Sequence, residues 1–349
     1  MLTHWQDRSL DDLLASAGLE GVAEVSFPND GWSGSTFSRL RHGDGTSFVL
    51  KRTSARIDWI VRETHDEQLR EAWAAVNLGP ALLPGPAIAP YVGAARDGDG
   101  AAILTPDLSD SLLGWQRPGA PALTVDGLVR VVEALARLHA GGWASKGPWC
   151  PLAERLLLTS RPTCQRLLPD GGAGAGAARR LLAGWDAFER AAPPAARALI
   201  ADLSADARPL VEALGRLPSC GLHGDLKLAN VALLGRETVG FIDWQMVTVA
   251  PVAVELGWLA VSNSVDLPIG FHGLMSRYRS ALAHGPAEPA IVGDWDAQLD
   301  LARIVGLLLR GWRKGLDAEA GARLGSGASG PDDLAEWSDA AVEAAARRL

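Results

Sequence analysis

Short runs that alternate between apolar and polar residues dominate the first third of the chain. Residues 1–20 predict a short amphipathic helix, and β-type segments follow at 22–27, 35–41 and 47–52. The turn His42-Gly43-Asp44-Gly45 tolerates positive φ and predicts a hairpin between the last two segments. A helix at 65–76, a proline-rich connection at 80–90 and a strand at 101–104 complete a small β-rich region.

Apolar residues at helical spacing dominate the rest of the chain. A strong amphipathic helix ends at His139-Ala140-Gly141-Gly142, where glycine is a typical stop signal. Residues 151–215 also predict helices, interrupted by a glycine-rich run at 171–176 that predicts a flexible surface loop. Further helices are predicted after 268 and from 335 to the end, and one apolar stripe contains Leu299, Ala302, Val305 and Leu309.

This order of elements predicts an α+β fold with two lobes. A chain of 349 residues is longer than one ordinary core usually serves. We expect a small β-rich N-terminal lobe at 1–104, a hinge at 105–110 and a larger, mainly helical C-terminal lobe at 111–349.

Composition narrows the class of protein. The chain is 48% hydrophobic and 21% charged, which is a globular balance, and its net charge of −8 argues against a nucleic-acid binder. The longest apolar runs are far too short to span a membrane. The N-terminus has no signal-peptide pattern, and the three cysteines are widely spaced without a Cys-x-x-Cys pair. We therefore expect a cytoplasmic protein, a monomer or a homodimer, without nucleic-acid or membrane partners.

One polar stretch carries the groups needed for phosphoryl transfer. His223-Gly224-Asp225-Leu226-Lys227-Leu228-Ala229-Asn230 is followed by a predicted hairpin, at 231–234 and 238–242, that ends in Asp243. Mg²⁺ prefers oxygen ligands, which carboxylates and a carboxamide supply, and a lysine suits the transferring phosphate. A plain hairpin with capping Asp and Asn residues is the alternative, but the joint spacing of all these groups favours a catalytic site.

The N-terminal lobe contains two candidate phosphate contacts. Lys51 ends a strand in a chain that has only three other lysines, Lys146, Lys227 and Lys314. It suits either phosphate binding or an ordinary strand end that reaches solvent. The loop at 29–36 contains Ser33-Gly34-Ser35, whose backbone amides suit phosphate oxygens, although such loops are also common between strands.

The stretch 223–230 with Phe241-Ile242-Asp243 resembles the catalytic signature of the aminoglycoside phosphotransferase and choline kinase-like family. The resemblance extends to Lys51, to Arg70-Glu71-Ala72 and to residues 135–140. It implies a protein kinase-like fold and a small-molecule kinase that uses ATP and Mg²⁺. The implied roles are a catalytic base at Asp225, Mg²⁺ ligands at Asn230 and Asp243, phosphate contacts at Lys51 and Lys227, and nucleotide-side positions at Ser33, Gly34, Ser35 and Glu71.

The sequence alone does not decide the roles of several polar residues. Glu67 and Glu71 lie one turn apart, and only the resemblance favours Glu71 as the partner of Lys51. His139 suits a catalytic base or, more often, local packing. The resemblance implies that His223 supports the loop. The run Ala250-Pro251-Val252-Ala253 departs from the family's pattern, and Glu255 is expected to keep an acidic, loop-ordering role.

The phosphate acceptor is predicted only by class. Seven residues separate Asp243 from Pro251, too few for the segment with which a protein kinase docks a polypeptide, so we expect a small-molecule hydroxyl acceptor. An aminoglycoside-like antibiotic, a sugar and an amino alcohol remain alternatives, as do ATP and GTP as donors. So does a catalytically silent nucleotide-binding module. Candidate acceptor contacts are Asp266, Asp294, Asp296, Asp300, Trp258, Trp312, Arg279, Arg303, Arg310 and Arg313, each of which also suits a cap, a solvated face or core packing.

Overall fold

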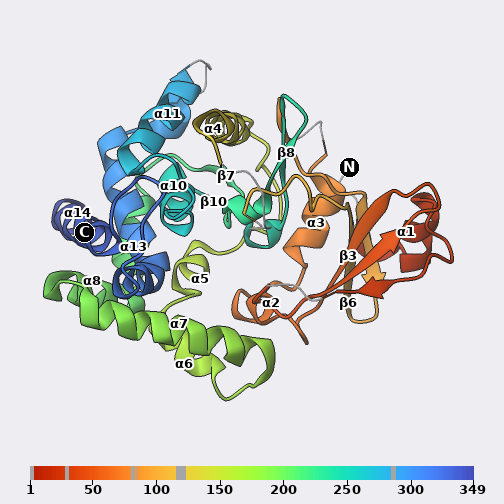
Figure 1. Cartoon of the computed structure of the whole chain (residues 1–349), viewed down its shortest axis with the longest axis horizontal. Coiled ribbons are helices and arrows are strands. Elements are labelled where there is room, and N and C mark those ends of the chain that lie inside the picture. The colour runs from red at the N-terminus through yellow and green to blue at the C-terminus, as the bar shows by residue number, and fades with distance from the viewer. Residues whose placement is uncertain (1–3, 28–30, 80–82, 84, 115–122, 284–287) are drawn as a thin grey trace.

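The structure, a computed structural model, describes residues 4–27, 31–79, 83, 85–114, 123–283 and 288–349. A small lobe built on one sheet lies beside a larger lobe made mostly of helices (Figure 1). This confirms the predicted α+β class with two lobes. Residues 29–30 of the predicted glycine-containing loop lie outside the described residues, as do 80–82 and 84 of the proline-rich connection.

The small lobe contains a five-stranded antiparallel sheet with the strand order β1-β2-β3-β6-β5. Its strands are β1 (Val25–Ser26), β2 (Thr36–Arg41), β3 (Ser47–Thr53), β5 (Gly93–Asp97) and β6 (Gly100–Pro106). The predicted hairpin at 42–45 joins β2 to β3. β1 is shorter than the predicted segment 22–27, and β5 was not predicted because its sequence, Gly-Ala-Ala-Arg-Asp, lacks β-branched and aromatic residues.

Helices α1 (Leu10–Ser16), α2 (Trp59–Glu63) and α3 (Arg70–Asn77) accompany this sheet. The predicted helix at 65–76 is wrong at its start, since α3 begins at Arg70. His65 and Leu69 have φ angles of 45° and 50°, which interrupt a right-handed helix. The buried Asp66 carboxylate accepts hydrogen bonds from the Arg70 backbone N–H at 3.0 and 2.8 Å and so fixes the first turn.

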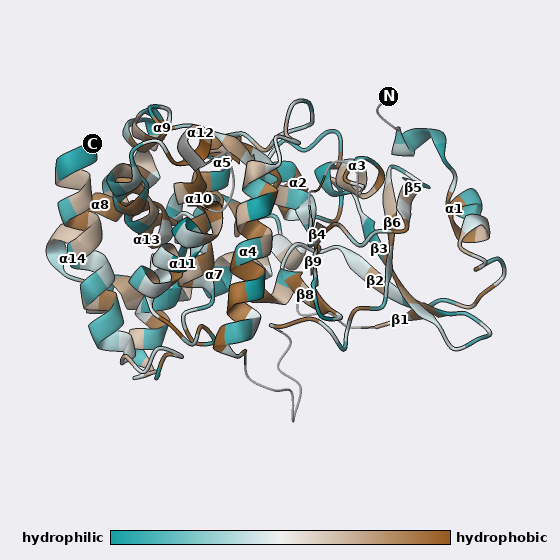
Figure 2. Ribbon diagram, turned by 90° about the horizontal axis from the view of Figure 1, so that it is seen from above, coloured by the Kyte–Doolittle hydropathy of each residue, from teal (hydrophilic) through white to brown (hydrophobic). Residues whose placement is uncertain are grey.

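The large lobe is built from helices around α13. Its helices are α4 (Val125–Ala140), α5 (Leu152–Leu157), α6 (Arg161–Leu167), α7 (Gly172–Ala191), α8 (Pro194–Ala205), α9 (Arg208–Leu214), α10 (Val252–Ser262), α11 (Phe271–Ala283), α12 (Glu288–Val292), α13 (Trp295–Glu319) and α14 (Gly330–Arg348). The long helix α13 packs against α7, α10 and α14. The predicted α4 has separate hydrophobic and hydrophilic faces, which Figure 2 shows as brown and teal bands.

The loop predicted at 171–176 is wrong, because this glycine-rich run forms the first turns of α7. A Cβ added at Gly174 would lie 3.0 Å from Cβ of Trp59, and one at Gly184 would lie 2.7 Å from the Trp312 carbonyl oxygen. Gly174 and Gly184 therefore allow neighbouring chain to approach α7 closely, a use that composition alone does not distinguish from flexibility.

A second hairpin stands between the lobes. β8 (Val231–Leu234) pairs with β9 (Thr238–Phe241), as predicted, and β9 pairs in parallel with the short strand β4 (Ala87–Ile88). On the other side, Leu112 forms a bridge with Ala232. Just before and after the hairpin, β7 (Cys220–Leu222) pairs with β10 (Thr248–Ala250). The catalytic stretch predicted from the sequence therefore lies where chain from both lobes meets.

No helix among the described residues combines the length and the apolar character needed to cross a lipid bilayer.

Candidate active site

The loop that carries Asp225 leaves strand β7 through a glycine that cannot be replaced without moving the backbone. Gly224 has a φ of 83°, and a Cβ placed on it would lie 1.8 Å from the carbonyl oxygen of Met246. Only glycine combines this backbone conformation with so close an approach. The loop is thereby pressed against the segment that follows Asp243.

A buried carboxylate anchors the same loop from the helical lobe. Glu255 of α10 accepts hydrogen bonds from the backbone N–H groups of His223 (2.9 Å) and Gly224 (2.7 Å). It also bonds to Nε2 of His139 at 3.1 Å, while Nδ1 of His139 bonds to the Tyr278 hydroxyl at 2.6 Å. Burial alone would raise the pKa of Glu255, but the hydrogen bonds from His139 and the Gly224 backbone, together with the charges of His139 and His223, outweigh it and lower that pKa. His139 is thus part of the loop's buried support, and both of its ring nitrogens are engaged there.

Asp225, Lys227 and Asn230 come together within this loop. Lys227 Nζ lies 2.9 Å from Asp225 Oδ2, and Asn230 Nδ2 donates to the backbone oxygen of Asp225 at 2.9 Å and to its Oδ2 at 3.3 Å. The Asp225 side chain keeps 17% exposure, so it remains accessible from solvent. The side-chain nitrogen of Asn230 is thus hydrogen-bonded within the loop, whereas its side-chain oxygen has no hydrogen-bond partner among the described residues.

Asp243 lies next to this loop and meets Lys51 from the small lobe. The backbone N–H of Ile242 donates to the Asn230 carbonyl at 3.0 Å, and His223 Nε2 bonds to the Ile242 carbonyl at 2.9 Å. Lys51 Nζ donates to Asp243 Oδ1 at 2.9 Å. Burial alone would raise the pKa of Asp243, but Lys51 and Lys227 lower it to about 2. Asp243 therefore stays ionised near neutral pH.

Lys51 has a second carboxylate partner, which is Glu71. Its Nζ lies 2.5 Å from Glu71 Oε2 in α3, whereas Glu67 is exposed on the turn before that helix. Burial opposes the charged form of Lys51, but Asp243 and Glu71 outweigh it and raise the pKa. Burial raises the pKa of Glu71 to about 7, against the effect of Lys51. One ammonium is thus shared by two carboxylates.

Tyr91 joins these groups and was missed by the sequence analysis. Its hydroxyl donates to Glu71 Oε1 at 3.1 Å and accepts from the Asp243 backbone N–H at 3.0 Å. Tyr91 is one of only two tyrosines in the chain, at the end of the proline-rich connection. Its rarity was the available signal, but its contacts depend on a fold that places the connection beside α3.

The loop Ser33-Gly34-Ser35 folds against the start of α2. Gly34 has a φ of 102°, and a Cβ on it would lie 2.1 Å from the Ile57 carbonyl oxygen. The Ser35 hydroxyl donates to the buried Asp58 carboxylate at 2.7 Å, and Asp58 also caps α2. The loop leads into β2, whose Phe37 is paired with Lys51. These residues therefore lie on the Lys51 side of the molecule.

The candidate acceptor residues separate into distant groups. Asp294 caps α13, Asp300 pairs with Arg347 and Arg348, and Asp266 and Asp296 are exposed. Arg303 stacks on Phe271 and Trp337, and Arg313 pairs with Asp317. Arg279 lines a cavity of about 430 Å³ beside Trp295. Arg310 instead contacts both Trp258 and Trp312, with its guanidinium 5.1 and 4.6 Å from the two rings.

The donor atoms present fit a magnesium nucleotide better than a preformed metal cage. Among the described residues, no three His, Cys, Asp or Glu side chains come together as a metal site. The free amide oxygen of Asn230 and the partly exposed Asp243 carboxylate offer hard oxygen atoms on neighbouring strand ends. Mg²⁺ in phosphoryl-transfer sites commonly takes few protein ligands and completes its shell with phosphate oxygens and water.

A small lobe with a Lys–Glu pair, joined to a helical lobe with an Asp-x-x-x-x-Asn loop, defines a protein kinase-like phosphotransferase. The chain belongs to the phosphotransferase enzyme family (APH), whose model matches residues 24–296. It is therefore a small-molecule kinase by class. No curated protein matches the chain.

Solved structures of similar fold include several small-molecule kinases. Choline kinase LicA from Streptococcus pneumoniae is 11% identical over 94% of this chain and 95% of its own, with a TM-score of 0.50. An aminoglycoside phosphotransferase from Alicyclobacillus acidocaldarius is 15% identical over 94% and 92%, with a TM-score of 0.39. Macrolide 2'-phosphotransferase MphH from Brachybacterium faecium is 19% identical over 95% and 97%, with a TM-score of 0.40. The match to LicA supports the fold alone.

Proposed function

We propose that this kinase transfers the γ-phosphate of ATP to a hydroxyl group of a small molecule, with Asp225 as the catalytic base. The observation that carries the proposal is the meeting of Asp225, Asn230 and Asp243 with Lys51 at the junction of the lobes. Phosphoryl transfer depends mainly on positioning and on neutralising phosphate charge, and these four side chains suit both tasks.

Each residue has a distinct part in the proposed reaction. Asn230 and Asp243 would hold Mg²⁺, which neutralises phosphate charge and orients the β- and γ-phosphates when it is bound. Lys51, kept in place by Glu71, would contact the α- and β-phosphates, with the loop 33–35 beside the nucleotide. Asp225 orients the acceptor hydroxyl and accepts its proton. The bond between the γ-phosphorus and the bridging oxygen breaks, a bond to the acceptor oxygen forms, and ADP leaves. Lys227 would neutralise charge on the transferred group.

The test is ADP release from Mg-ATP with pooled hydroxyl acceptors, comparing the wild type with Asp225→Asn. The asparagine keeps the shape of the side chain and loses the base, so we expect turnover to fall by roughly 10²- to 10⁴-fold. Binding of Mg-ATP, followed by the rise in melting temperature, should persist.

Asp296→Asn is the matched control, because Asp296 is exposed on α13. It should turn over like the wild type. Equal turnover of Asp225→Asn and the wild type would remove Asp225 from the mechanism. Binding of ATP without turnover in any pool would indicate a silent nucleotide-binding module.

A further inference from the structure

Two arginines behind the catalytic loop form no ion pair with any residue that the structure describes. Arg155 of α5 is 1% exposed, and its Nε donates to the Gly224 carbonyl at 2.6 Å. Its Nη2 is buried without a hydrogen-bond partner, as is Nε of Arg310 on α13. Within the described part of the chain, no ion pair engages either guanidinium. The direct bond to Gly224 places Arg155 immediately beside Asp225.

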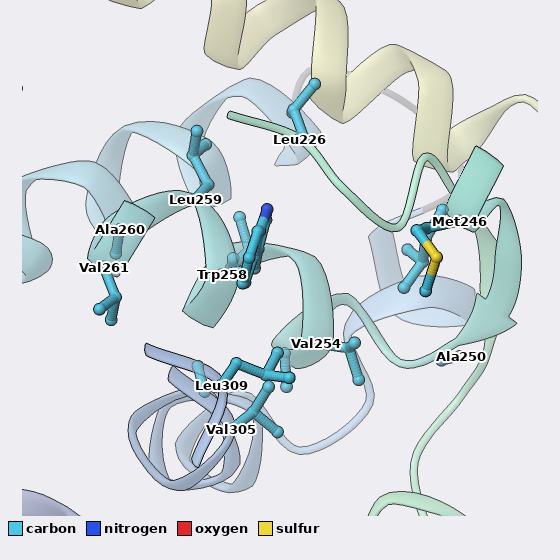
Figure 3. Close-up of a cluster of buried hydrophobic side chains, with 14 of the residues drawn as sticks. Leu226, Met246, Ala250, Val254, Trp258, Leu259, Ala260, Val261, Val305 and Leu309 are labelled. Atoms are coloured by element: carbon cyan, nitrogen blue, oxygen red, sulfur yellow. The ribbon is translucent and has the colours of Figure 1, made fainter. Parts of the chain in front are cut away.

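The ring of Trp258 connects the two arginines. The Arg155 guanidinium lies 4.3 Å from this ring and that of Arg310 lies 5.1 Å from it. The indole nitrogen of Trp258 is also buried without a partner. Figure 3 shows Trp258 rising from α10 among Leu226, Val305 and Leu309, with its nitrogen, in this view, on the side of Leu226. The arginines and Trp258 therefore form one cluster under the catalytic loop.

Charge interactions support the same placement. Burial lowers the pKa of Arg155, and the Asp225 carboxylate opposes that change. Burial and the neighbouring Arg313 lower the pKa of Arg310 to about 10, again against the effect of Asp225. Both guanidiniums thus lie near enough to Asp225 to feel its charge, yet Asp225 already contacts Lys227.

Such an arrangement is unfavourable for the protein alone. Taking a charged group out of water costs several kcal/mol unless a partner of opposite charge replaces the water, and two cations near one ring also repel each other. Lys314, another buried cation of α13, is paired with Asp333. Buried charged groups without a partner of opposite charge are expected mainly at functional sites.

We propose that the acceptor carries an anionic group near its reacting hydroxyl, and that Arg310, backed by Arg155, binds this group. The inference rests on the proposed kinase function and names its substrate class: hydroxylated carboxylates, sulfates or phosphates. A guanidinium binds such groups through two parallel hydrogen bonds. Trp312 and Trp258 provide aromatic surface beside it. An amine in the same place would meet two cations, so this site disfavours cationic aminoglycosides.

The experiment compares three sugars that differ in charge: glucuronate, glucose and glucosamine. ADP release from Mg-ATP is measured with each, and also with pooled hydroxy acids, neutral sugars and amino sugars. We expect the anionic members to give the highest kcat/KM. In Arg310→Gln the KM for the best anionic acceptor should rise about 10- to 100-fold, while the KM for ATP stays unchanged. Arg310→Lys should restore part of the loss.

Arg190→Gln is the control, because Arg190 is an exposed arginine of α7 that is paired with Glu319. A third variant, Arg310→Met, separates binding from structure. Removal of an uncompensated charge should leave the melting temperature unchanged or raise it, whereas a purely structural arginine would lower it.

The inference is overturned if the anionic acceptors are used no better than the neutral and cationic ones. It is also overturned if Arg310→Gln raises the KM for ATP as much as that for the acceptor, since the arginine would then bind the nucleotide. Turnover of only neutral or cationic acceptors would leave the kinase proposal standing and reject the anionic substrate class alone. The absence of both turnover and an ATP-dependent melting shift would reject both.

Discussion

The two groups of cations on either side of Asp225 differ in how their charge is balanced. On the side proposed for the nucleotide, Lys51 is held between Glu71 and Asp243. On the other side, Arg155 and Arg310 have no carboxylate within ion-pair distance among the described residues, and their shared neighbour is Trp258. The charge of Lys51 is balanced without a ligand, whereas the charges of Arg155 and Arg310 are not.

This difference indicates two modes of ligand binding. A magnesium nucleotide bound as proposed would have to displace the contact between Lys51 and Asp243, so its affinity would depend on breaking contacts that already exist. An anion that binds Arg310 would displace no ion-pair partner and would balance a buried positive charge. The same substitution, loss of a positive charge, should therefore have opposite effects on stability at the two places.

Lys51→Met should have the largest effect on stability. The methionine fills the space of the lysine stem but leaves the Glu71 and Asp243 carboxylates facing each other without a cation. We expect the free energy of unfolding to fall by about 3 kcal/mol at neutral pH, as measured by urea denaturation. Arg310→Met is the comparison, and an equal loss in both variants would show that the two groups of cations do not differ in this way.

Asp243→Asn should chiefly change metal-dependent nucleotide binding. Lys51 keeps Glu71 as its partner, but the negative charge proposed to hold Mg²⁺ is gone. We expect Mg-ATP to bind on the order of a hundredfold more weakly in calorimetric titration, while ATP without Mg²⁺ changes little. Arg310→Gln should leave both affinities unchanged. Unaltered Mg-ATP affinity in Asp243→Asn would remove Asp243 from the proposed metal site.

Glu71→Gln should change the pH dependence of stability. The pKa of Glu71 is raised from 4.5 to about 7 in the folded protein. Between these values the folded state binds more protons than the unfolded state, so stability falls as pH rises from about 4.5 to about 7. Glutamine does not titrate, so this part of the decline should disappear in melting curves recorded from pH 5 to 8.

Glu67→Gln is the control for that series, because Glu67 is exposed in the same region. Burial also raises the pKa of Asp66, to about 6, and this contribution has the same sign in every variant. The prediction therefore concerns the difference between Glu71→Gln and the control. If stability declines with rising pH equally in Glu71→Gln and Glu67→Gln, the decline is due to other titrating groups.

The sequence predicted those parts of the site that depend on local spacing. Residues 223–230 and the following hairpin bring Asp225, Asn230 and Asp243 together through a short stretch of chain, so the motif and the geometry coincide. Lys51 was predicted from its place at the end of a strand and its rarity. The hairpin β2–β3 followed from alternation and turn residues in the same way.

The parts that were missed depend on contacts between distant segments. Arg155 was missed, and Arg310 was one of ten candidate acceptor contacts that the sequence did not rank. The two arginines are 155 positions apart, and neither has a local pattern that distinguishes it from other arginines of the helical lobe. Tyr91 contacts Glu71 and Asp243 only because the connection before β5 folds beside α3. The start of α3 depends on positive φ angles at His65 and Leu69, which are not residues that composition associates with such a conformation.

Glu255 also determines which parts of the molecule can move relative to the reacting groups. Its carboxylate connects the Asp225 loop to α10 and, through His139 and Tyr278, to α4 and α11. Lys51 and Glu71 belong to the other lobe and meet this framework at Asp243. A rotation of one lobe against the other would therefore change the distance between Lys51 and Asp243 and leave that between Asp225 and Arg310 the same. In the proposed mechanism, closure of the two lobes would bring Lys51 toward a loop in which Asp225 is already held in place.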